Sequence, residues 1–290
     1  MSNQVSNIEL PMAAVEKIVA QALAEDLPWG DVTSDNLIPS SQRGVGRIEA
    51  HQSGVLAGLP VARAVFAQVD PRLDFEPHCA DGTHLQPGQV VATLRGSLRT
   101  LLRGERVALN LLQRLSGIAT VTDRYVKAVE GCRARITDTR KTTPGLRVLE
   151  RYAVRIGGGH NHRHCLSDAV LIKDNHLVAL RARGVDLSQA VAHLRQTLPH
   201  TMTIEVETET LTDVREALAA GVDAILLDNM SPELMAEAVR LIDHRAVVEA
   251  SGGITLETVR AAAETGVDLI SIGALTHSVR SLDLSLEIVV

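Results

Sequence analysis

From residue 135 to residue 273 the chain alternates short apolar runs with amphipathic stretches of helical length, and this alternation restricts its fold more than any other feature. The apolar runs predict strands at 135–139, 169–173, 203–207, 224–228, 247–250 and 269–272. The stretches between them predict helices at 146–155, 187–198, 211–219, 232–242 and 256–265. Strands that alternate with helices form parallel sheets joined by right-handed crossovers, so this part of the chain is predicted to be an α/β domain.

Polar, charged or glycine residues stand at the C-terminal end of nearly every predicted strand. They are Asp138, Arg140, Lys141, Lys173, Asp174, Glu207, Asp228, Asn229, Ser251, Gly252, Gly253 and Gly273. In a β/α barrel the loops that follow the strands meet at one mouth, where the active site lies. A doubly wound open sheet is the main alternative, but it usually has a glycine fingerprint after its first strand, which is lacking here. Because only six strand–helix repeats are clear, we predict an incomplete barrel.

The first half of the chain predicts a smaller unit that is rich in strands. A helix is predicted at 13–24, and residues 25–31 form a loop in which Trp29 is expected to be a packing residue. Short strands at 47–50, 55–59, 73–78 and 90–94 surround a helix at 60–69. A long helix at 98–129 is expected to bridge two domains, with break points at Gly104 and Gly117. Residues 284–290 predict a strand that returns to the N-terminal unit.

Three segments in the middle of the chain bring many cations close to glycines. Residues 138–145, 157–163 and 171–176 contain Arg140, Lys141, Arg163 and Lys173 together with several histidines. Cations near a core of low dielectric constant repel one another unless an anion neutralises them, so the ligand is expected to carry several negative charges. The net charge of −6 and the 2% of aromatic residues argue against a nucleic acid or an anionic membrane as partner.

The cysteines and the chain start predict the compartment. Cys79, Cys132 and Cys165 show no C-x-x-C spacing, so we expect three free thiols in a reducing environment. Met1–Leu10 has no signal-like pattern, and no run of 18 apolar residues occurs. A soluble, cytoplasmic protein is expected.

Two strand–glycine–helix segments, at 249–255 and 271–275, predict a phosphate site, because the amide groups of such turns and the helix N-terminus attract anions. Ordinary βα turns are the alternative.

Glu207 and Asp228 each end an apolar strand, and paired carboxylates near phosphate predict Mg²⁺. An ion pair of each with Lys141 or Lys173 is equally consistent with the sequence. Glu205 is expected to lie deeper and to hold a lysine.

The histidines at 160, 162 and 164 are not expected to bind a metal, because Arg163 lies among them. A hydrogen bond from His162 to a carboxylate is preferred. Lys141 or Lys173 could instead form a Schiff base, as in an aldolase, if it were desolvated.

Arg103, Arg106 and Arg114 follow one another along the long helix. They are either solvated or reach into a pocket, including one of a neighbouring subunit.

The order and spacing of the motifs resemble the quinolinate phosphoribosyltransferase family, the carboxylating nicotinate-nucleotide pyrophosphorylases of NAD biosynthesis, over nearly the whole chain. The shared motifs are Glu25-Asp26, Gly30–Thr33, Asp81-Gly82, Gly104–Arg106, Leu115–Thr120, Asp138–Gly145, Gly157–Arg163, Lys173–His176, Leu227–Asn229, Ser251–Gly253 and Gly273–His277. The resemblance implies an N-terminal α/β sandwich (1–116, with strand 279–290) and an open, incomplete β/α barrel (117–278). It also implies homodimers, or higher homo-oligomers, with shared active sites.

The resemblance further implies a reaction and roles for residues. Quinolinate and phosphoribosyl pyrophosphate would react with Mg²⁺ to give nicotinate mononucleotide, pyrophosphate and CO₂. Arg106 from the partner subunit, Thr139, Arg140, His162 and Arg163 would bind quinolinate. Lys141 and Lys173 would bridge the two substrates, and Glu207 and Asp228 would hold Mg²⁺ or the ribose. Ser251, Gly252, Gly253 and Gly273 would bind the 5′-phosphate, assisted by His277.

Two other functions remain open from the sequence. A homologue of the same fold tied to molybdate transport would keep the phosphate site but alter the carboxylate grip of Arg140, His162 and Arg163. A non-catalytic polyanion-binding protein would keep the cations without needing Glu207 or Asp228.

Overall fold

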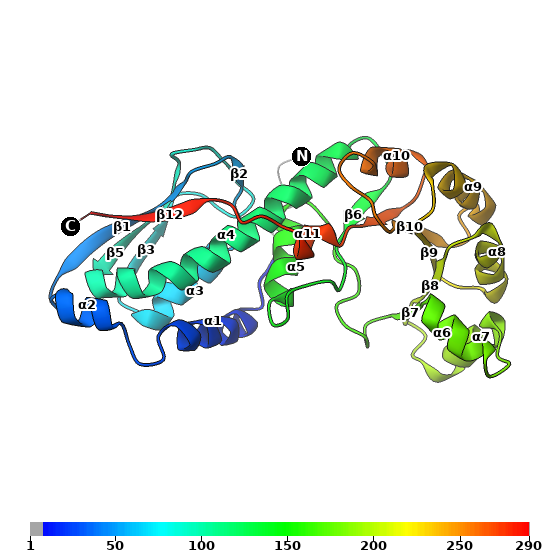
Figure 1. Cartoon of the computed structure of the whole chain (residues 1–290), viewed down its shortest axis with the longest axis horizontal. Helices are drawn as coiled ribbons and strands as arrows, with labels where there is room; N and C mark the ends of the chain where they lie inside the picture. The colour runs from blue at the N-terminus through cyan, green and yellow to red at the C-terminus, as the bar shows by residue number, and fades with distance from the viewer. Residues whose placement is uncertain (1–7, 290) are drawn as a thin grey trace. The chain divides into compact units, whose positions relative to one another are not determined.

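The structure is a computed structural model that describes residues 8–289 (Figure 1). The predicted lack of a signal pattern in Met1–Leu10 falls mostly on residues outside this range, as does Val290 at the end of the predicted C-terminal strand. Two compact units form. The N-terminal unit combines the described residues up to Asp123 with Lys141–Gly158 and the residues from Ala274 onwards, and the barrel unit consists of Arg124–Arg140 and Gly159–Gly273.

The N-terminal unit is built on a four-stranded antiparallel sheet with the order β12-β1-β5-β3. Its strands are β1 (Arg43–Ala50), β3 (Asp74–Pro77), β5 (Val90–Ser97) and β12 (Leu284–Val289), and β2 (Gly54–Val55) pairs separately with β4 (His84–Leu85). The predicted return of the C-terminal strand is confirmed, since Val289 lies opposite Val45. The helices of this unit are α1 (Met12–Asp26), α2 (Val32–Leu37), α3 (Leu59–Val69), α5 (Arg147–Ile156) and α11 (Ala274–His277).

Helix α4 (Leu98–Ala128) runs from the N-terminal unit into the barrel unit without interruption, so the predicted breaks at Gly104 and Gly117 are wrong. Both glycines serve close packing instead. A Cβ atom at Gly104 would lie 2.6 Å from the ring of Phe66, and one at Gly117 would overlap the carbonyl oxygen of Arg280. Packing at these two points compensates for the lower helix propensity of glycine.

The barrel unit contains a parallel six-stranded sheet with the order β6-β11-β10-β9-β8-β7. Its strands are β6 (Arg135–Thr137), β7 (Val170–Ile172), β8 (Ile204–Thr208), β9 (Ala224–Asp228), β10 (Val247–Ser251) and β11 (Leu269–Ser271). From β7 to β11 each strand is placed beside the previous one, and the first strand, β6, follows β11. This is the order of a barrel that stays open between β6 and β7. A doubly wound sheet would reverse direction at a switch point.

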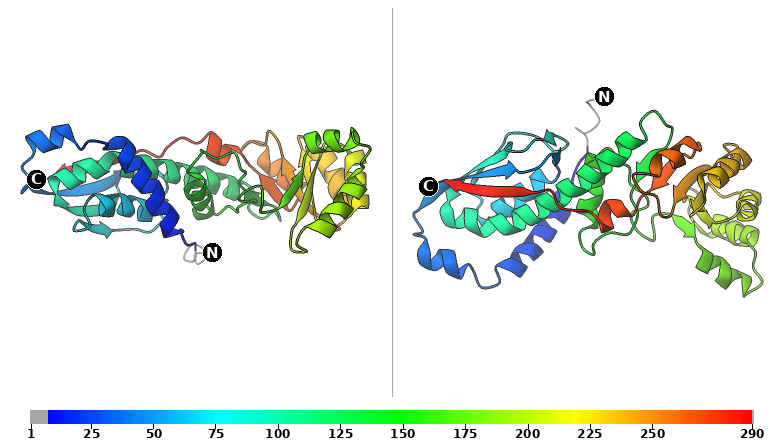
Figure 2. Two further views of the ribbon diagram at one scale, coloured as in Figure 1. Left: turned by 90° about the horizontal axis from the view of Figure 1, so that it is seen from below. Right: turned by 45° about the horizontal axis from the view of Figure 1, so that its top comes forward.

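Helices α6 (Asp174–Arg181), α7 (Leu187–Thr197), α8 (Leu211–Ala220), α9 (Pro232–Ile242) and α10 (Val259–Glu264) connect the strands. Helices α7, α8 and α9 lie along one face of the curved sheet (Figures 1 and 2). The core of the sheet is aliphatic, with Val206, Ile225 and Leu227 almost completely buried. This agrees with the scarcity of aromatic residues. The predicted open β/α barrel with an N-terminal α/β domain is therefore confirmed.

Three further features concern the surface and the thiols. None of the helices between residues 8 and 289 combines the length and the apolar character needed to cross a bilayer. The three cysteines are free thiols, as predicted. Trp29 is 94% exposed, so its predicted packing role is wrong within the single chain.

Candidate functional site

The C-terminal end of β6 fixes the segment with the predicted quinolinate ligands. Asp138 is fully buried, and its carboxylate accepts hydrogen bonds from the backbone N–H of His162 at 2.8 Å and from Asn161 Nδ2 at 2.6 Å. The backbone N–H of His160 donates to the carbonyl of Ile136. A buried carboxylate that accepts several N–H groups resists displacement, so this segment is held rigidly against the sheet.

Two buried glutamates, on the strands that flank β9, contact His162. Its Nε2 lies 3.3 Å from Glu205 Oε2 on β8 and 3.3 Å from Glu249 Oε2 on β10. Burial lowers the pKa of His162, but the hydrogen bonds and charges of both glutamates outweigh burial and raise it to about 10. The predicted hydrogen bond from His162 to a carboxylate is thus confirmed. The expectation that Glu205 holds a lysine is wrong, because its carboxylate faces the imidazole.

The hydrogen bonds of His162 indicate which of its ring nitrogens carries a proton. Nδ1 accepts the backbone N–H of Arg163 at 2.7 Å, which requires a lone pair on Nδ1. This contact describes a ring protonated only at Nε2, whereas the raised pKa describes a doubly protonated ring. Burial also raises the pKa of Glu205, so a proton held between His162 and Glu205 is consistent with both observations.

One ligand atom each of His162, Glu205 and Glu249 lies within 4.8 Å of the others, a spacing that a metal ion could also fit. A metal bound to Nε2 would require the ring proton on Nδ1, where the structure has an acceptor. The arrangement therefore favours a proton over a metal ion in this cluster.

Arg140 and Arg163 lie close enough to affect each other. Burial lowers the pKa of Arg163, and the charge of Arg140 lowers it further, while the charge of Glu205 acts in the opposite direction. Arg163 Nη1 donates to the carbonyl of Ala169 at 2.9 Å, which orients the guanidinium. Two neighbouring guanidinium groups above a histidine form a site suited to a planar dicarboxylate.

Lys173 and Glu207 form an ion pair across the ends of β7 and β8. Lys173 Nζ lies 3.0 Å from Glu207 Oε2, and the two side chains are 47% and 13% exposed. The sequence left open whether Glu207 pairs with a lysine, and the structure shows that it pairs with Lys173. An exposed, ion-paired lysine lacks the desolvation that a Schiff-base nucleophile needs, so an aldolase mechanism at Lys173 is disfavoured.

The ends of β9 and β10 are locked to each other by their turns. Asp228 pairs in register with Ser251, and the N–H of Asn229 donates to the carbonyl of Ser251 at 3.0 Å. Gly252 has φ +89°, and a Cβ atom there would lie 2.8 Å from the backbone nitrogen of Asn229. Only glycine fits this turn. Glu207 and Asp228, on adjacent strands, present oxygen ligands of the kind that Mg²⁺ prefers, so these residues fit a magnesium ion.

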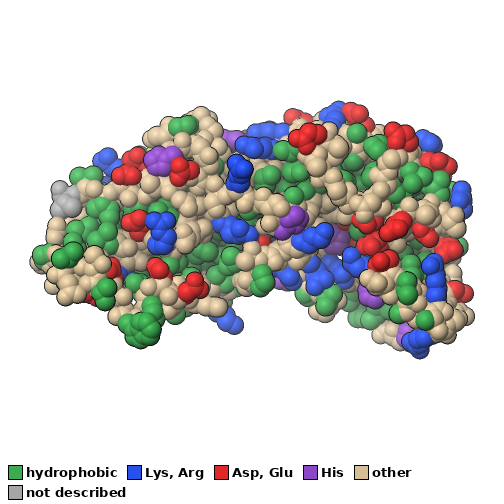
Figure 3. All heavy atoms as spheres, in the orientation of Figure 1, with side chains coloured by type: hydrophobic (Ala, Val, Ile, Leu, Met, Phe, Trp, Pro, Cys, Tyr) green, Lys and Arg blue, Asp and Glu red, His purple; other side chains and the backbone are tan. Residues whose placement is uncertain are grey.

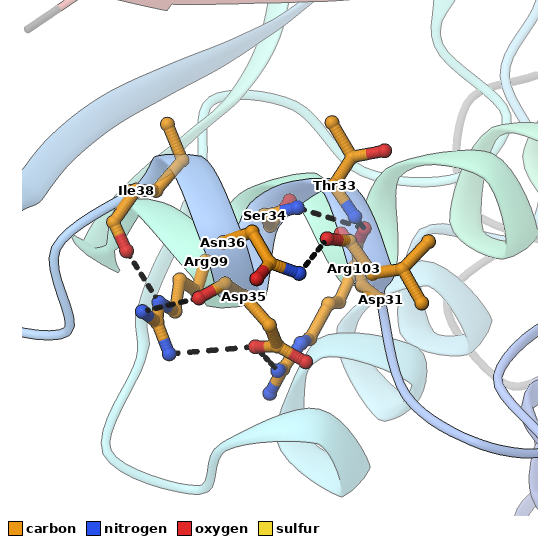
Figure 4. Close-up of polar contacts among 9 residues, drawn as sticks. Asp31, Thr33, Ser34, Asp35, Asn36, Ile38, Arg99 and Arg103 are labelled. Atoms are coloured by element: carbon orange, nitrogen blue, oxygen red, sulfur yellow. Dashed lines mark hydrogen bonds and ion pairs between the residues drawn. The ribbon is translucent and has the colours of Figure 1, made fainter.

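The N-terminal unit holds the other predicted ligands. A cavity of about 540 Å³ is lined by Arg114, Lys141, Thr142, Thr143 and His277. Arg106 is exposed, and its closest carboxylate is Glu105 at 3.7 Å. Arg103 instead pairs with Asp35 of α2, which Arg99 also contacts (Figure 4). Of Arg103, Arg106 and Arg114, which the sequence singled out on α4, only Arg114 therefore lines the cavity.

The barrel unit thus brings together Arg140 with Arg163 and His162, Lys173 with Glu207, and Asp228 with Ser251 and Gly252. The sequence reasoning missed the functional contacts of Glu249, Arg114 and Glu150. Glu249 could have been noticed as a charged residue inside an apolar strand, where an isolated carboxylate is costly and needs a partner.

Comparisons with known proteins identify the family of the chain. Residues 118–287 match the family profile described as "Quinolinate phosphoribosyl transferase, C-terminal domain", and residues 31–116 match that of the N-terminal domain. A relative from Synechocystis sp., named as a probable carboxylating nicotinate-nucleotide pyrophosphorylase, is 47% identical over 282 residues, which cover 96% of this chain and 94% of the relative. A relative of the same name from Bacillus subtilis is 44% identical and covers 94% of this chain and 93% of its own.

Solved structures lead to the same family. NadC from Streptococcus pyogenes superposes with a TM-score of 0.91 at 42% identity, covering 96% of this chain and 97% of that chain. The nicotinate-nucleotide pyrophosphorylase from Francisella tularensis has a TM-score of 0.90 at 35% identity, covering 97% and 98%. The chain therefore belongs to the quinolinate phosphoribosyltransferase family.

Proposed function

We propose that the chain transfers the phosphoribosyl group of phosphoribosyl pyrophosphate to quinolinate and releases CO₂, forming nicotinate mononucleotide and pyrophosphate. The observation that carries this function is the family match over nearly the whole chain. The cationic rim supports it, because both substrates are polyanions. The reaction belongs to the pentosyl transfers of NAD biosynthesis.

Quinolinate is the proposed ligand of Thr139, Arg140, His162 and Arg163, joined by Arg106 of a second copy of the chain. Guanidinium forks match planar carboxylates and bind them with two parallel hydrogen bonds. His162 adds a hydrogen-bonding group whose position is set by Asp138, Glu205 and Glu249. Quinolinate bound in this way presents its pyridine nitrogen for attack. The carboxylate next to that nitrogen is then free to leave.

Phosphoribosyl pyrophosphate is the proposed ligand of the glycine turns and the lysines. Ser251, Gly252, Gly253 and Gly273 supply amide donors for the 5′-phosphate, assisted by His277, while Lys141 and Lys173 supply positive charge between the two substrates. Glu207 and Asp228 are the residues that would hold Mg²⁺, and the ion would supply positive charge that stabilises the departing pyrophosphate.

The chemistry follows from these placements. As pyrophosphate leaves, positive charge develops on the ribose and negative charge on the leaving group, which the fixed cations stabilise. Attack by the ring nitrogen gives a positively charged pyridinium. The positive charge of that nitrogen stabilises the electron pair that stays on the adjacent ring carbon when the carboxylate departs as CO₂, and a proton then bonds to this carbon in place of the carboxylate.

We further propose a cytoplasmic homodimer with shared sites. Supporting this proposal, Trp29, Val32 and Leu37 are 94%, 75% and 73% exposed, and Figure 3 shows hydrophobic side chains at the surface near α1 and α2. Exposed apolar clusters mark interaction surfaces. Arg106 is also exposed and is available to a neighbouring copy.

Purified protein with quinolinate, phosphoribosyl pyrophosphate and Mg²⁺ tests the function by the release of CO₂ and the formation of nicotinate mononucleotide. Turnover that requires all three supports the proposal. Binding of both anions without turnover would favour the non-catalytic polyanion-binding alternative. A lack of quinolinate binding together with retained phosphate binding would favour the molybdate-related homologue.

Shared sites are tested by mixing two inactive variants, Arg106→Ala and Lys141→Ala. In hybrid dimers one of the two sites would contain both native residues, so partial recovery of activity is expected. Verified hybrids that remain inactive would exclude this arrangement.

A further inference from the structure

Arg114 connects the two segments that carry Lys141 and His277. Its Nη2 donates to Thr143 Oγ1 at 2.8 Å and to the carbonyl of Thr276 at 3.0 Å. Thr143 lies two residues after Lys141, and Thr276 directly precedes His277. One guanidinium therefore holds both cation-bearing segments of the cavity at once.

Glu150 fixes the guanidinium in turn. This carboxylate is fully buried on α5, and its Oε1 accepts from Arg114 Nε at 2.8 Å and from Nη2 at 2.6 Å. Its other oxygen accepts the backbone N–H of Thr143 at 3.1 Å. A carboxylate bound by both a guanidinium fork and a backbone amide allows little freedom to either partner.

A further hydrogen bond closes the network. Thr276 is fully buried, and its Oγ1 donates to the carbonyl of Lys141 at 2.7 Å. The backbone of Lys141 is thus tied to the segment that leads to His277, independently of Arg114. Glu150 neutralises Arg114, so the pair organises the cavity while Lys141 supplies its positive charge and His277 supplies an imidazole ring for hydrogen bonding.

We propose that Arg114 and Glu150 are positioning residues that hold Lys141 and His277 for a phosphate group of phosphoribosyl pyrophosphate. This inference rests on the proposed transferase function. The point charge of Lys141, the imidazole of His277 and the hydroxyl groups of Thr142 and Thr143 suit a tetrahedral phosphate better than a planar carboxylate. Arg114 and Glu150 act through Lys141 and His277. Replacing either member of the pair should therefore weaken the binding of phosphoribosyl pyrophosphate and not that of quinolinate.

Arg114→Lys keeps the charge but cannot bridge Glu150, Thr143 and Thr276 together. Glu150→Gln places an amide N–H₂ or a single carbonyl where two acceptor oxygens are needed. In both variants the KM for phosphoribosyl pyrophosphate is expected to rise about tenfold. The affinity for quinolinate, measured by calorimetry without the second substrate, is expected to change less than about twofold. Arg124→Lys, at an exposed site on the same helix, is the control.

Thr143→Val and Thr143→Ser test the same network without touching the buried ion pair. The valine variant loses the acceptor for Arg114 and should raise the same KM, whereas the serine variant keeps the hydroxyl and should restore it. Unchanged KM values in all folded variants, or equal loss of affinity for both substrates, would overturn the proposal. If the wild-type chain shows no turnover, the proposed function fails instead, so the two failures are distinguishable.

Discussion

The two units position their cationic groups by different means. In the barrel unit, strand register and tight turns set the rim, and two buried carboxylates face one histidine from below. In the N-terminal unit, one guanidinium paired with one carboxylate ties two separate segments together. The barrel rim therefore depends on backbone shape and on a retained proton, whereas the cavity around Lys141 depends on one buried ion pair and the hydrogen bonds around it.

The largest expected effect tests the backbone shape of the barrel rim. Gly252→Ala should lower kcat/KM at least about 100-fold, because the new Cβ atom collides with Asn229 and φ +89° disfavours any side chain. Gly253→Ala is the matched control. Its nearest neighbour would be 4.0 Å away, so only its φ of +60° is unfavourable, and a smaller loss is expected. Equal activity of the two variants would show that the turn tolerates change.

The second prediction compares the buried carboxylates of the two units by urea unfolding at pH 7. Glu150→Ala should reduce the free energy of unfolding by about 2 to 4 kcal/mol, since Arg114 and the N–H of Thr143 lose their acceptor. Glu249→Ala should cost less, about 1 to 2 kcal/mol, because Glu205 still faces His162. A larger loss for Glu249→Ala would reverse the comparison.

The third prediction uses the raised pKa of His162. A group whose pKa is raised on folding stabilises the protein fully below its unfolded pKa of 6.5, and this stabilisation is lost as pH rises toward the folded pKa of about 10. The free energy of unfolding should therefore fall by about 1 to 3 kcal/mol between pH 6.5 and pH 9.5. Glu249→Gln removes one carboxylate and should flatten this slope. An equal slope in both proteins would place the titrating group elsewhere.

The smallest expected effect concerns the N-terminus of α2 (Figure 4). Asp31 Oδ1 accepts the backbone N–H groups of Thr33 at 3.1 Å and Ser34 at 3.0 Å. Asp31→Ala should reduce the free energy of unfolding by about 1 kcal/mol, while Asp31→Asn, which keeps an acceptor, should change it by only a few tenths. Thermal or urea unfolding that fails to separate the two variants would contradict the capping role.

Local patterns predict the barrel helices and strands well where apolar periodicity and end signals coincide. The predicted bounds of Ala224–Asp228 and Pro232–Ile242 agree with the structure, and the latter helix begins at a proline preceded by the N-cap Ser231. Helix α6 escaped prediction because its apolar residues, 177–180, form one short continuous run instead of recurring at helical spacing. The breaks predicted in α4 failed because the partners of Gly104 and Gly117 are distant in sequence.

The residues of the candidate site fall into the same two groups: those that local sequence predicts and those whose contacts depend on distant segments. Residue type and strand ends predicted that Lys173 and Glu207 lie at the rim, where they form an ion pair. The partner of each carboxylate depends on which strands become neighbours, and single-sequence patterns do not contain that information. For this reason Glu205 was assigned to a lysine although it faces His162, and the network of Arg114 with Glu150 was missed.

We expect Arg140, His162 and Arg163 to bind a dicarboxylate together. A comparison of ligands that differ by one carboxylate tests this expectation most directly. Calorimetric titration of the wild-type chain with quinolinate and with nicotinate, which lacks the second carboxylate, should show at least about 100-fold tighter binding of quinolinate. In Arg163→Ala this preference should shrink to about tenfold or less. Equal affinities for the two ligands in the wild-type chain, or an unchanged preference in the variant, would contradict the account.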